Sequence, residues 1–116
     1  MNENKFNEIK SIYNISDQDA VTEYLLEIDE ENPQLLEKLL DVLIEMPNKL
    51  LEVFHEKLGT LTLEFFADAE ANFSQLFVTV DSGLEPNNAI DLLDNIFDTW
   101  YMGLEPDLRQ LVTVTI

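Results

Sequence analysis

The chain has 116 residues, of which 46% are apolar, and this is enough for one acidic domain, residues 1–116, with a single core. It contains no cysteine, which excludes disulfides, thiolate nucleophiles and zinc-thiolate sites. The 24 acidic residues against 6 lysines and arginines give a net charge of −18, which repels nucleic acid and anionic membranes and requires any electrostatic partner to be cationic.

The N-terminal half has the hydrophobic periodicity of helices, and we predict about four of them. Asn32 and Pro33 provide an N-cap and a first-turn proline for the third helix. Pro47 lacks an N–H group and should break or kink that helix, and Gly59 is placed to end the fourth. The predicted helices cover about residues 5–13, 17–31 and 33–45 and the segment between Pro47 and Gly59.

After Gly59 the sequence changes to strand-like alternation and becomes rich in β-branched and aromatic residues. Pro86 fits the start of a further helix, whose apolar stripe begins at Ile90 and which should end at Gly103. We therefore expect an α+β fold in which a β-hairpin, this helix and a C-terminal strand follow the N-terminal helices and form a small three-stranded antiparallel or mixed sheet. The strands are predicted near residues 60–66, 73–80 and 110–116.

Acidic residues occupy the polar faces of three predicted helices, because steps of about 100° per residue place them away from the apolar stripes. Acids four residues apart repel by about 0.2–0.5 kcal/mol per pair. Glu–Lys pairs at this spacing are nearly absent, because only Glu45 and Lys49 could form one, and Pro47 lies between them. Two interpretations stay open: a solvated surface that favours solubility, and a surface that recognises a partner. The candidate partner-binding residues are Asp19, Glu23, Glu27, Glu30, Glu31, Glu37, Asp41, Glu45, Asp91, Asp94 and Asp98.

Carboxylates four residues apart repeat about every 6 Å along a helix, so a row of them is broadly comparable with the phosphates of a nucleic-acid backbone. In size, acidity and carboxylate-lined helices the chain resembles the small bacterial and phage DNA-mimic proteins. The resemblance implies an inhibitor that occupies the DNA-binding surface of a basic DNA-binding protein, such as an HU-like nucleoid protein, a repressor or a defence nuclease. The alternatives are an immunity protein that neutralises a basic nuclease toxin and an acidic adaptor domain.

The sequence contains no pattern typical of catalysis. With one His, no Cys and three Gly, the chain cannot form a Gly-rich phosphate loop or a nucleophile-base pair. We therefore expect that the protein is not an enzyme and has no cofactor or metal site. His55 is expected on an exposed helix face, and Arg109 is expected to pair with Glu105 or Asp107. No apolar run could span a bilayer and the N-terminus does not resemble a signal peptide, so we expect a cytoplasmic protein that does not bind membranes. We expect it to be a monomer or a small homo-oligomer.

Overall fold

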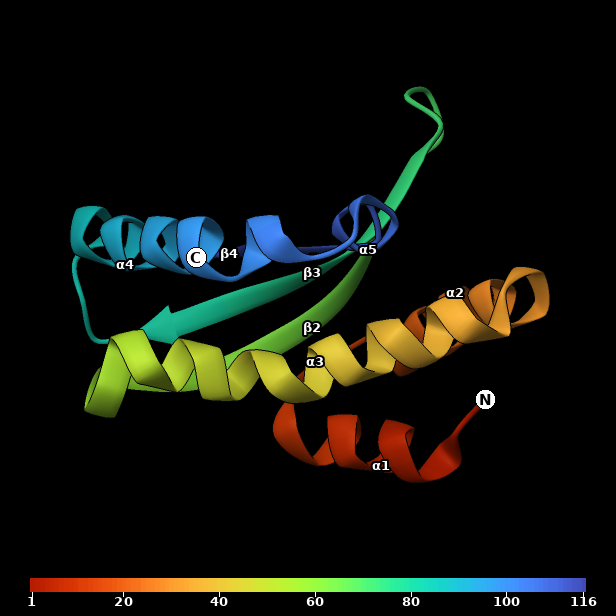
Figure 1. Cartoon of the computed structure of the whole chain (residues 1–116), viewed down its shortest axis with the longest axis horizontal. Helices are drawn as coiled ribbons and strands as arrows, with labels where there is room; N and C mark the ends of the chain where they lie inside the picture. Colours follow the sequence, from red (N-terminus) through yellow and green to blue (C-terminus); the bar gives the residue numbers. More distant parts are fainter.

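The computed structural model describes residues 1–116 and has an α+β fold, as predicted, with five α-helices and a four-stranded mixed sheet (Figure 1). The helices are α1 (Glu3–Ile12), α2 (Gln18–Glu31), α3 (Pro33–Phe54), α4 (Pro86–Thr99) and α5 (Pro106–Arg109). The strands are β1 (Asn14–Ser16), β2 (Leu58–Asp68), β3 (Phe73–Ser82) and β4 (Val112–Thr115). Short 3₁₀ turns at His55–Lys57 and Tyr101–Gly103 follow α3 and α4.

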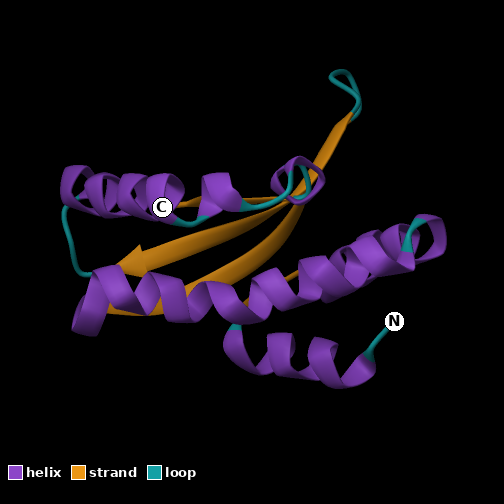
Figure 2. Cartoon of the chain, viewed as in Figure 1, coloured by secondary structure: helices purple, strands orange, loops and turns teal.

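The strands lie in the sheet in chain order, β1-β2-β3-β4. β2 and β3 form the predicted antiparallel hairpin, whereas β1 runs parallel to β2 and β4 runs parallel to β3. The helices cover one face of this sheet (Figure 2), so along β2 the side chains of Leu61 and Leu63 are buried while those of Glu64 and Phe66 point to the other face and are exposed. The tip of the hairpin extends beyond the helical layer (Figure 1).

The prediction of three strands was wrong because it missed β1. This strand has only three residues, too few for an alternating pattern to be recognised, and it lies between α1 and α2. Its middle residue, Ile15, pairs with Leu63 on β2 and packs against the hydrophobic core. β1 therefore extends the sheet by one strand and fixes the place where the N-terminal helices meet β2.

α3 continues through Pro47, so the prediction of a break at this residue was wrong and two predicted helices are one. In a regular helix the carbonyl of Leu43 accepts a hydrogen bond from the N–H of residue 47, which proline lacks. The buried hydroxyl of Tyr13 donates to that carbonyl instead, at 2.7 Å. A tertiary hydrogen bond from the residue that follows α1 thus replaces the missing helical donor.

The prediction that Gly59 ends a helix was wrong, because this residue lies in β2. α3 ends at Phe54, and the chain turns away through His55, whose φ of 51° is in the left-handed region. A Cβ atom on Gly59 would lie 2.8 Å from the backbone oxygen of Asp81 on β3, closer than real Cβ contacts. The glycine is therefore required by the close approach of the two strands, and not by the end of a helix.

The predicted starts of α3 and α4 were confirmed, and the predicted end of α4 was not. Asn32 accepts a hydrogen bond from the backbone N–H of Leu35 at 3.1 Å, and Pro86 occupies the first turn of α4. α4 ends at Thr99, before the 3₁₀ turn that contains Gly103. Ile90 is 45% exposed and does not begin the buried stripe, because the residues of α4 that pack into the core are Ala89, Leu93 and Ile96.

Candidate functional site

A row of carboxylates lies along the solvent-facing side of α2, and we call it the α2 ridge. Its members are exposed, and none of them belongs to any of the five ion pairs of the structure. They span about 18 Å of helix axis, or roughly one charge per 4 Å, against roughly one per 3.4 Å along a single DNA strand. The α2 ridge consists of Asp19, Glu23, Glu27, Glu30 and Glu31.

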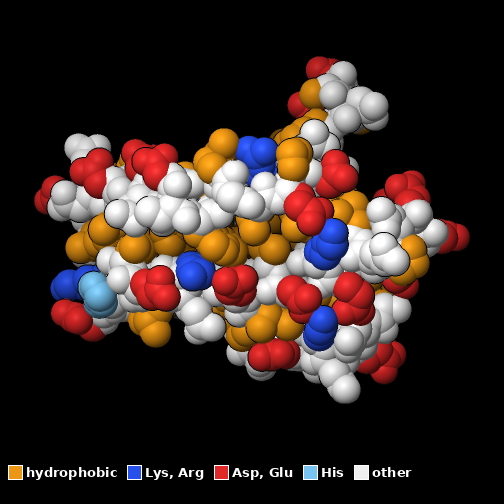
Figure 3. Space-filling view, viewed as in Figure 1, with side chains coloured by type: hydrophobic (Ala, Val, Ile, Leu, Met, Phe, Trp, Pro, Cys, Tyr) orange, Lys and Arg blue, Asp and Glu red, His pale blue; other side chains and the backbone are white.

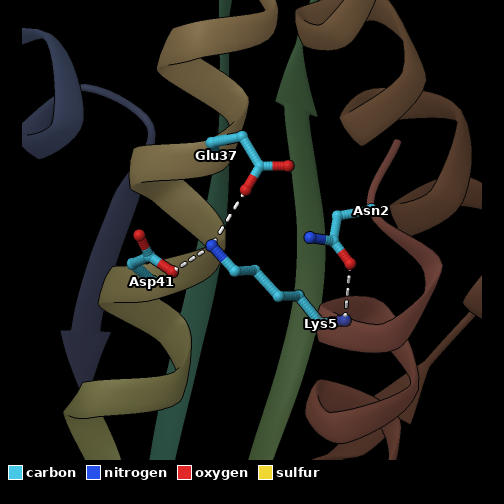
Figure 4. A network of polar contacts seen from close by, with 4 residues as sticks. All are labelled: Asn2, Lys5, Glu37 and Asp41. Atoms are coloured by element: carbon cyan, nitrogen blue, oxygen red, sulfur yellow. Dashed lines mark hydrogen bonds and ion pairs between the residues drawn. The ribbon is translucent and has the colours of Figure 1, made fainter.

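The carboxylates on the first half of α3 share one basic partner within the molecule. Lys5 of α1 reaches across to α3, where its Nζ atom lies 2.9 Å from a carboxylate oxygen of Glu37 and 2.6 Å from one of Asp41 (Figure 4). Asn2 caps α1 by accepting a hydrogen bond from the backbone N–H of Lys5 at 3.1 Å. The hydrogen bonds to Asp41 and then to Glu37 raise the pKa of Lys5 above its usual 10.5, so this lysine stays charged.

The second half of α3 contains the remaining compensated acid. Because the helix continues through Pro47, Glu45 and Lys49 lie one turn apart, with 4.0 Å between a carboxylate oxygen and Nζ. The one Glu–Lys pair that the sequence offers at this spacing therefore forms despite Pro47, and Lys5 adds a base that spacing on α3 alone did not predict. On the face shown in Figure 3, blue lysine side chains lie among the red carboxylates over the region formed by α1 and α3.

Asp91, Asp94 and Asp98 on α4 are exposed and also lack ion-pair partners. They do not extend the α2 ridge, because α4 lies at the opposite end of the molecule from α2 (Figure 1). The candidate residues predicted from the sequence thus fall into three separate groups, and the α2 ridge is the largest group without compensating charge.

The largest concave site of the molecule, of about 460 Å³, lies between α2, the hairpin and the segment before β4. We call it the α2–hairpin groove. Glu27 and Glu31 of the α2 ridge form part of its wall, so the ridge and the groove are continuous. The hydroxyl of Tyr24 donates to the backbone oxygen of Ser74 at 3.4 Å and links α2 to the hairpin. Burial raises the pKa of Tyr24, which keeps this phenol neutral.

Three phenylalanines in contact form an aromatic patch on the sheet face that the helices leave open. The ring centroid of Phe66 lies 6.3 Å from that of Phe73 and 5.7 Å from that of Phe77. Phe66 is 44% exposed and Phe73 is 41% exposed, and Phe73 also lines the α2–hairpin groove. This patch was not predicted from the sequence. The signal was present, because side chains alternate between the two faces of a strand, so an inward Phe65 on β2 implies an outward Phe66.

Arg109 does not form the predicted pair with Glu105 or Asp107. Glu105 instead pairs with Lys38, whose Nζ atom lies 3.0 Å away. An Nη atom of Arg109 lies 3.6 Å from the sulfur of Met102, and its Nε atom is buried without a hydrogen-bond partner. His55 is exposed, as predicted, but it lies in the 3₁₀ turn that follows α3 and not on a helix face.

The structure contains no group of three or more His, Asp or Glu side chains close enough together to hold a metal ion. None of its helices combines the length and the apolar character needed to cross a bilayer. Comparison with protein-family models, curated proteins and solved structures found no match to this chain. A functional proposal therefore has to rest on the α2 ridge, the α2–hairpin groove and the aromatic patch.

Proposed function

We propose that this protein is a non-catalytic acidic inhibitor that mimics DNA, and that the α2 ridge occupies the DNA-binding surface of a basic DNA-binding protein. HU-like nucleoid proteins, repressors and defence nucleases are the partner classes. The observation that carries the proposal is the contrast between two helices: the predicted acids of α3 are paired with Lys5 and Lys49, whereas those of α2 have no basic partner.

This contrast matters because a paired carboxylate has to lose its internal partner before it can bind another protein, whereas the α2 ridge is available at once. Its three pairs at spacing four, Asp19–Glu23, Glu23–Glu27 and Glu27–Glu31, together cost about 0.6–1.5 kcal/mol of stability through repulsion. A cationic partner would relieve that repulsion on binding. The net charge of −18 also steers a basic protein toward the complex, at a rate that falls as salt screens the field.

The experiment is a competition with DNA. A labelled DNA duplex is bound to an HU-like nucleoid protein, or to a repressor or nuclease recovered with this chain from a bacterial lysate, and the chain is titrated in. We expect release of the DNA and an apparent affinity that weakens as salt is added. Glu23→Lys combined with Glu27→Lys should strongly weaken the release and leave folding intact, because both side chains are exposed.

The matched control reverses two acids outside the α2 ridge, Asp94→Lys with Asp98→Lys on α4. Each double variant changes the net charge by +4, from −18 to −14, so the two differ only in the place of the change. Equal weakening by both variants would mean that total charge, and not the ridge, governs binding. A ternary complex in which DNA remains bound would contradict mimicry outright.

The aromatic patch favours a second candidate function, an immunity protein that neutralises a basic nuclease toxin. Immunity proteins recognise one toxin through shape and aromatic contacts, and Phe66, Phe73 and Phe77 offer such contacts beside acidic side chains. This candidate predicts tight binding to one nuclease, loss of nuclease activity and, where binding is beside the active site, continued DNA binding in the competition experiment. An acidic adaptor domain would bind without displacing DNA or inhibiting a nuclease.

A further inference from the structure

The α2–hairpin groove combines three features that attract a cation. Glu27 and Glu31 line it and have no ion-pair partner. The last turn of α2 contains no basic residue, and the one cation paired with it is the N-terminal ammonium, which lies 3.0 Å from Asp29, so the negative end of the helix dipole adds to the charge of Glu27 and Glu31. Phe73 is 41% exposed and contributes an aromatic ring, whose face attracts positive charge, whereas the ring of Tyr24 is buried and lies 4.8 Å from that of Phe65.

The same walls distinguish between cations. Tyr24, Ile28, Phe73 and Leu111 make four of the nine lining residues hydrophobic, so a ligand that enters the groove loses part of its hydration. A guanidinium group is planar, stacks on aromatic rings, binds carboxylates through two parallel hydrogen bonds and is more weakly hydrated than an ammonium group. An arginine side chain therefore suits this groove better than a lysine side chain.

The groove volume and the charge of the chain further restrict the occupant. A volume of about 460 Å³ is within the range of sites that hold small ligands, so the groove has room for one side chain. A second copy of this chain is an unsuitable occupant, because it would bring another net charge of −18 to an acidic surface. The charge complementarity is instead with a basic protein.

We infer that the α2–hairpin groove seats an arginine side chain of the basic partner, between the ring of Phe73 and the carboxylates of Glu27 and Glu31. The inference rests on the proposed function, since it names the side chain that the partner inserts beside the α2 ridge. It also adds specificity, because the ridge alone attracts every cation, whereas the groove prefers a planar one.

The test compares two peptides of equal charge, blocked tetra-arginine and blocked tetra-lysine, in NMR titrations of the full chain at about 150 mM salt, where exposed charges are screened beyond about 8 Å. We expect the arginine peptide to shift resonances of Glu27, Glu31 and Phe73 and to bind about twofold to fivefold more tightly, the ratio that corresponds to an exposed cation–π contact. Equal affinity of the two peptides, or shifts spread equally over α4, would overturn the inference.

Two variants locate the preference in the groove. Phe73→Leu removes the ring but keeps an apolar side chain, and should abolish the preference for arginine while leaving the affinity for tetra-lysine unchanged. Phe66→Leu is the matched control, because Phe66 is similarly exposed on the same hairpin but does not line the groove, and it should keep the preference. A preference that survives Phe73→Leu would overturn the inference.

A second pair of variants tests the carboxylates without changing any ring. Glu27→Gln with Glu31→Gln should weaken arginine binding more than Asp94→Asn with Asp98→Asn, which removes the same charge from α4. The DNA competition separates this inference from the proposed function. DNA release without a preference for arginine would leave mimicry supported and overturn the groove, whereas the preference without DNA release would support the groove and overturn mimicry.

Discussion

The hydrogen bond from Tyr13 to the carbonyl of Leu43 makes a quantitative prediction about α3. Tyr13→Phe removes the hydroxyl and leaves this buried carbonyl without the donor that replaces the missing N–H of Pro47. Loss of a partner for a buried polar group costs about 1–3 kcal/mol, a large part of the roughly 5–15 kcal/mol that stabilises a typical domain. We expect the free energy of unfolding in urea to fall by this amount, with an unchanged m-value.

A double-mutant cycle with Pro47→Ala tests the cause. Alanine restores the N–H at residue 47, so the carbonyl of Leu43 again has a helical donor and Tyr13→Phe should cost less in this background. The expected coupling is at least about 0.5 kcal/mol, the lower end of values for residues in one hydrogen-bond network. Tyr101→Phe is the control, because the hydroxyl of Tyr101 donates to the carbonyls of Arg109 and Val112, away from Pro47.

The result that would refute this reasoning is additivity. If Tyr13→Phe costs the same with and without Pro47, to within about 0.3 kcal/mol, the hydroxyl does not replace the helical donor. Tyr101→Phe should cost the same in both backgrounds, and an equal coupling for Tyr101 would show that Pro47→Ala acts through the whole fold instead of through Leu43.

Two further predictions concern backbone packing and pH. Gly59→Ala should lower the free energy of unfolding by about 1–3 kcal/mol in a urea titration, because the new Cβ would lie 2.8 Å from the carbonyl oxygen of Asp81. Gly103→Ala is the control and should change this free energy little, because a Cβ there would have no other atom within 4 Å. Burial raises the pKa of Tyr13 above its usual 10.0. The contribution of its neutral hydroxyl to the free energy of unfolding is therefore complete below pH 10 and is lost as the pH rises above that value. Between about pH 9 and 11 the free energy of unfolding of Tyr13→Phe should therefore fall less than that of the wild type. The raised pKa of Lys5 affects both proteins equally, so it does not contribute to this difference.

The parts of the fold that the sequence predicted correctly depend on local interactions. Asn32 and Pro33 mark the start of α3 because a cap and a first-turn proline act within one turn of chain. The strands of the hairpin were recognised because alternation reflects the two faces of a sheet. The continuity of α3 was missed because Pro47 is a breaker by every local rule, and the compensating donor, Tyr13, is far away in the sequence.

The candidate site divides in the same way. Exposure of the predicted acids follows from helical periodicity, and ten of the eleven are exposed, with Glu37 half-buried. Their pairing was not predictable from spacing on one helix, because Lys5 reaches Glu37 and Asp41 from α1. The α2–hairpin groove was also missed, since Glu31 and Phe73 come together only when the hairpin packs beside α2.

The chain order of the sheet has a consequence for synthesis on the ribosome. α2 and α3 lie between β1 and β2 in the sequence, so the parallel pairing of β1 with β2 requires only the chain up to Asp68. β3 then adds through a short hairpin, which is a local closure with a small entropic cost. β4 joins last, at an edge that β3 already provides. No strand has to be inserted between two others, so folding can advance in the same direction as translation, and the final step seats Val112 and Val114 beside Leu76 and Val78.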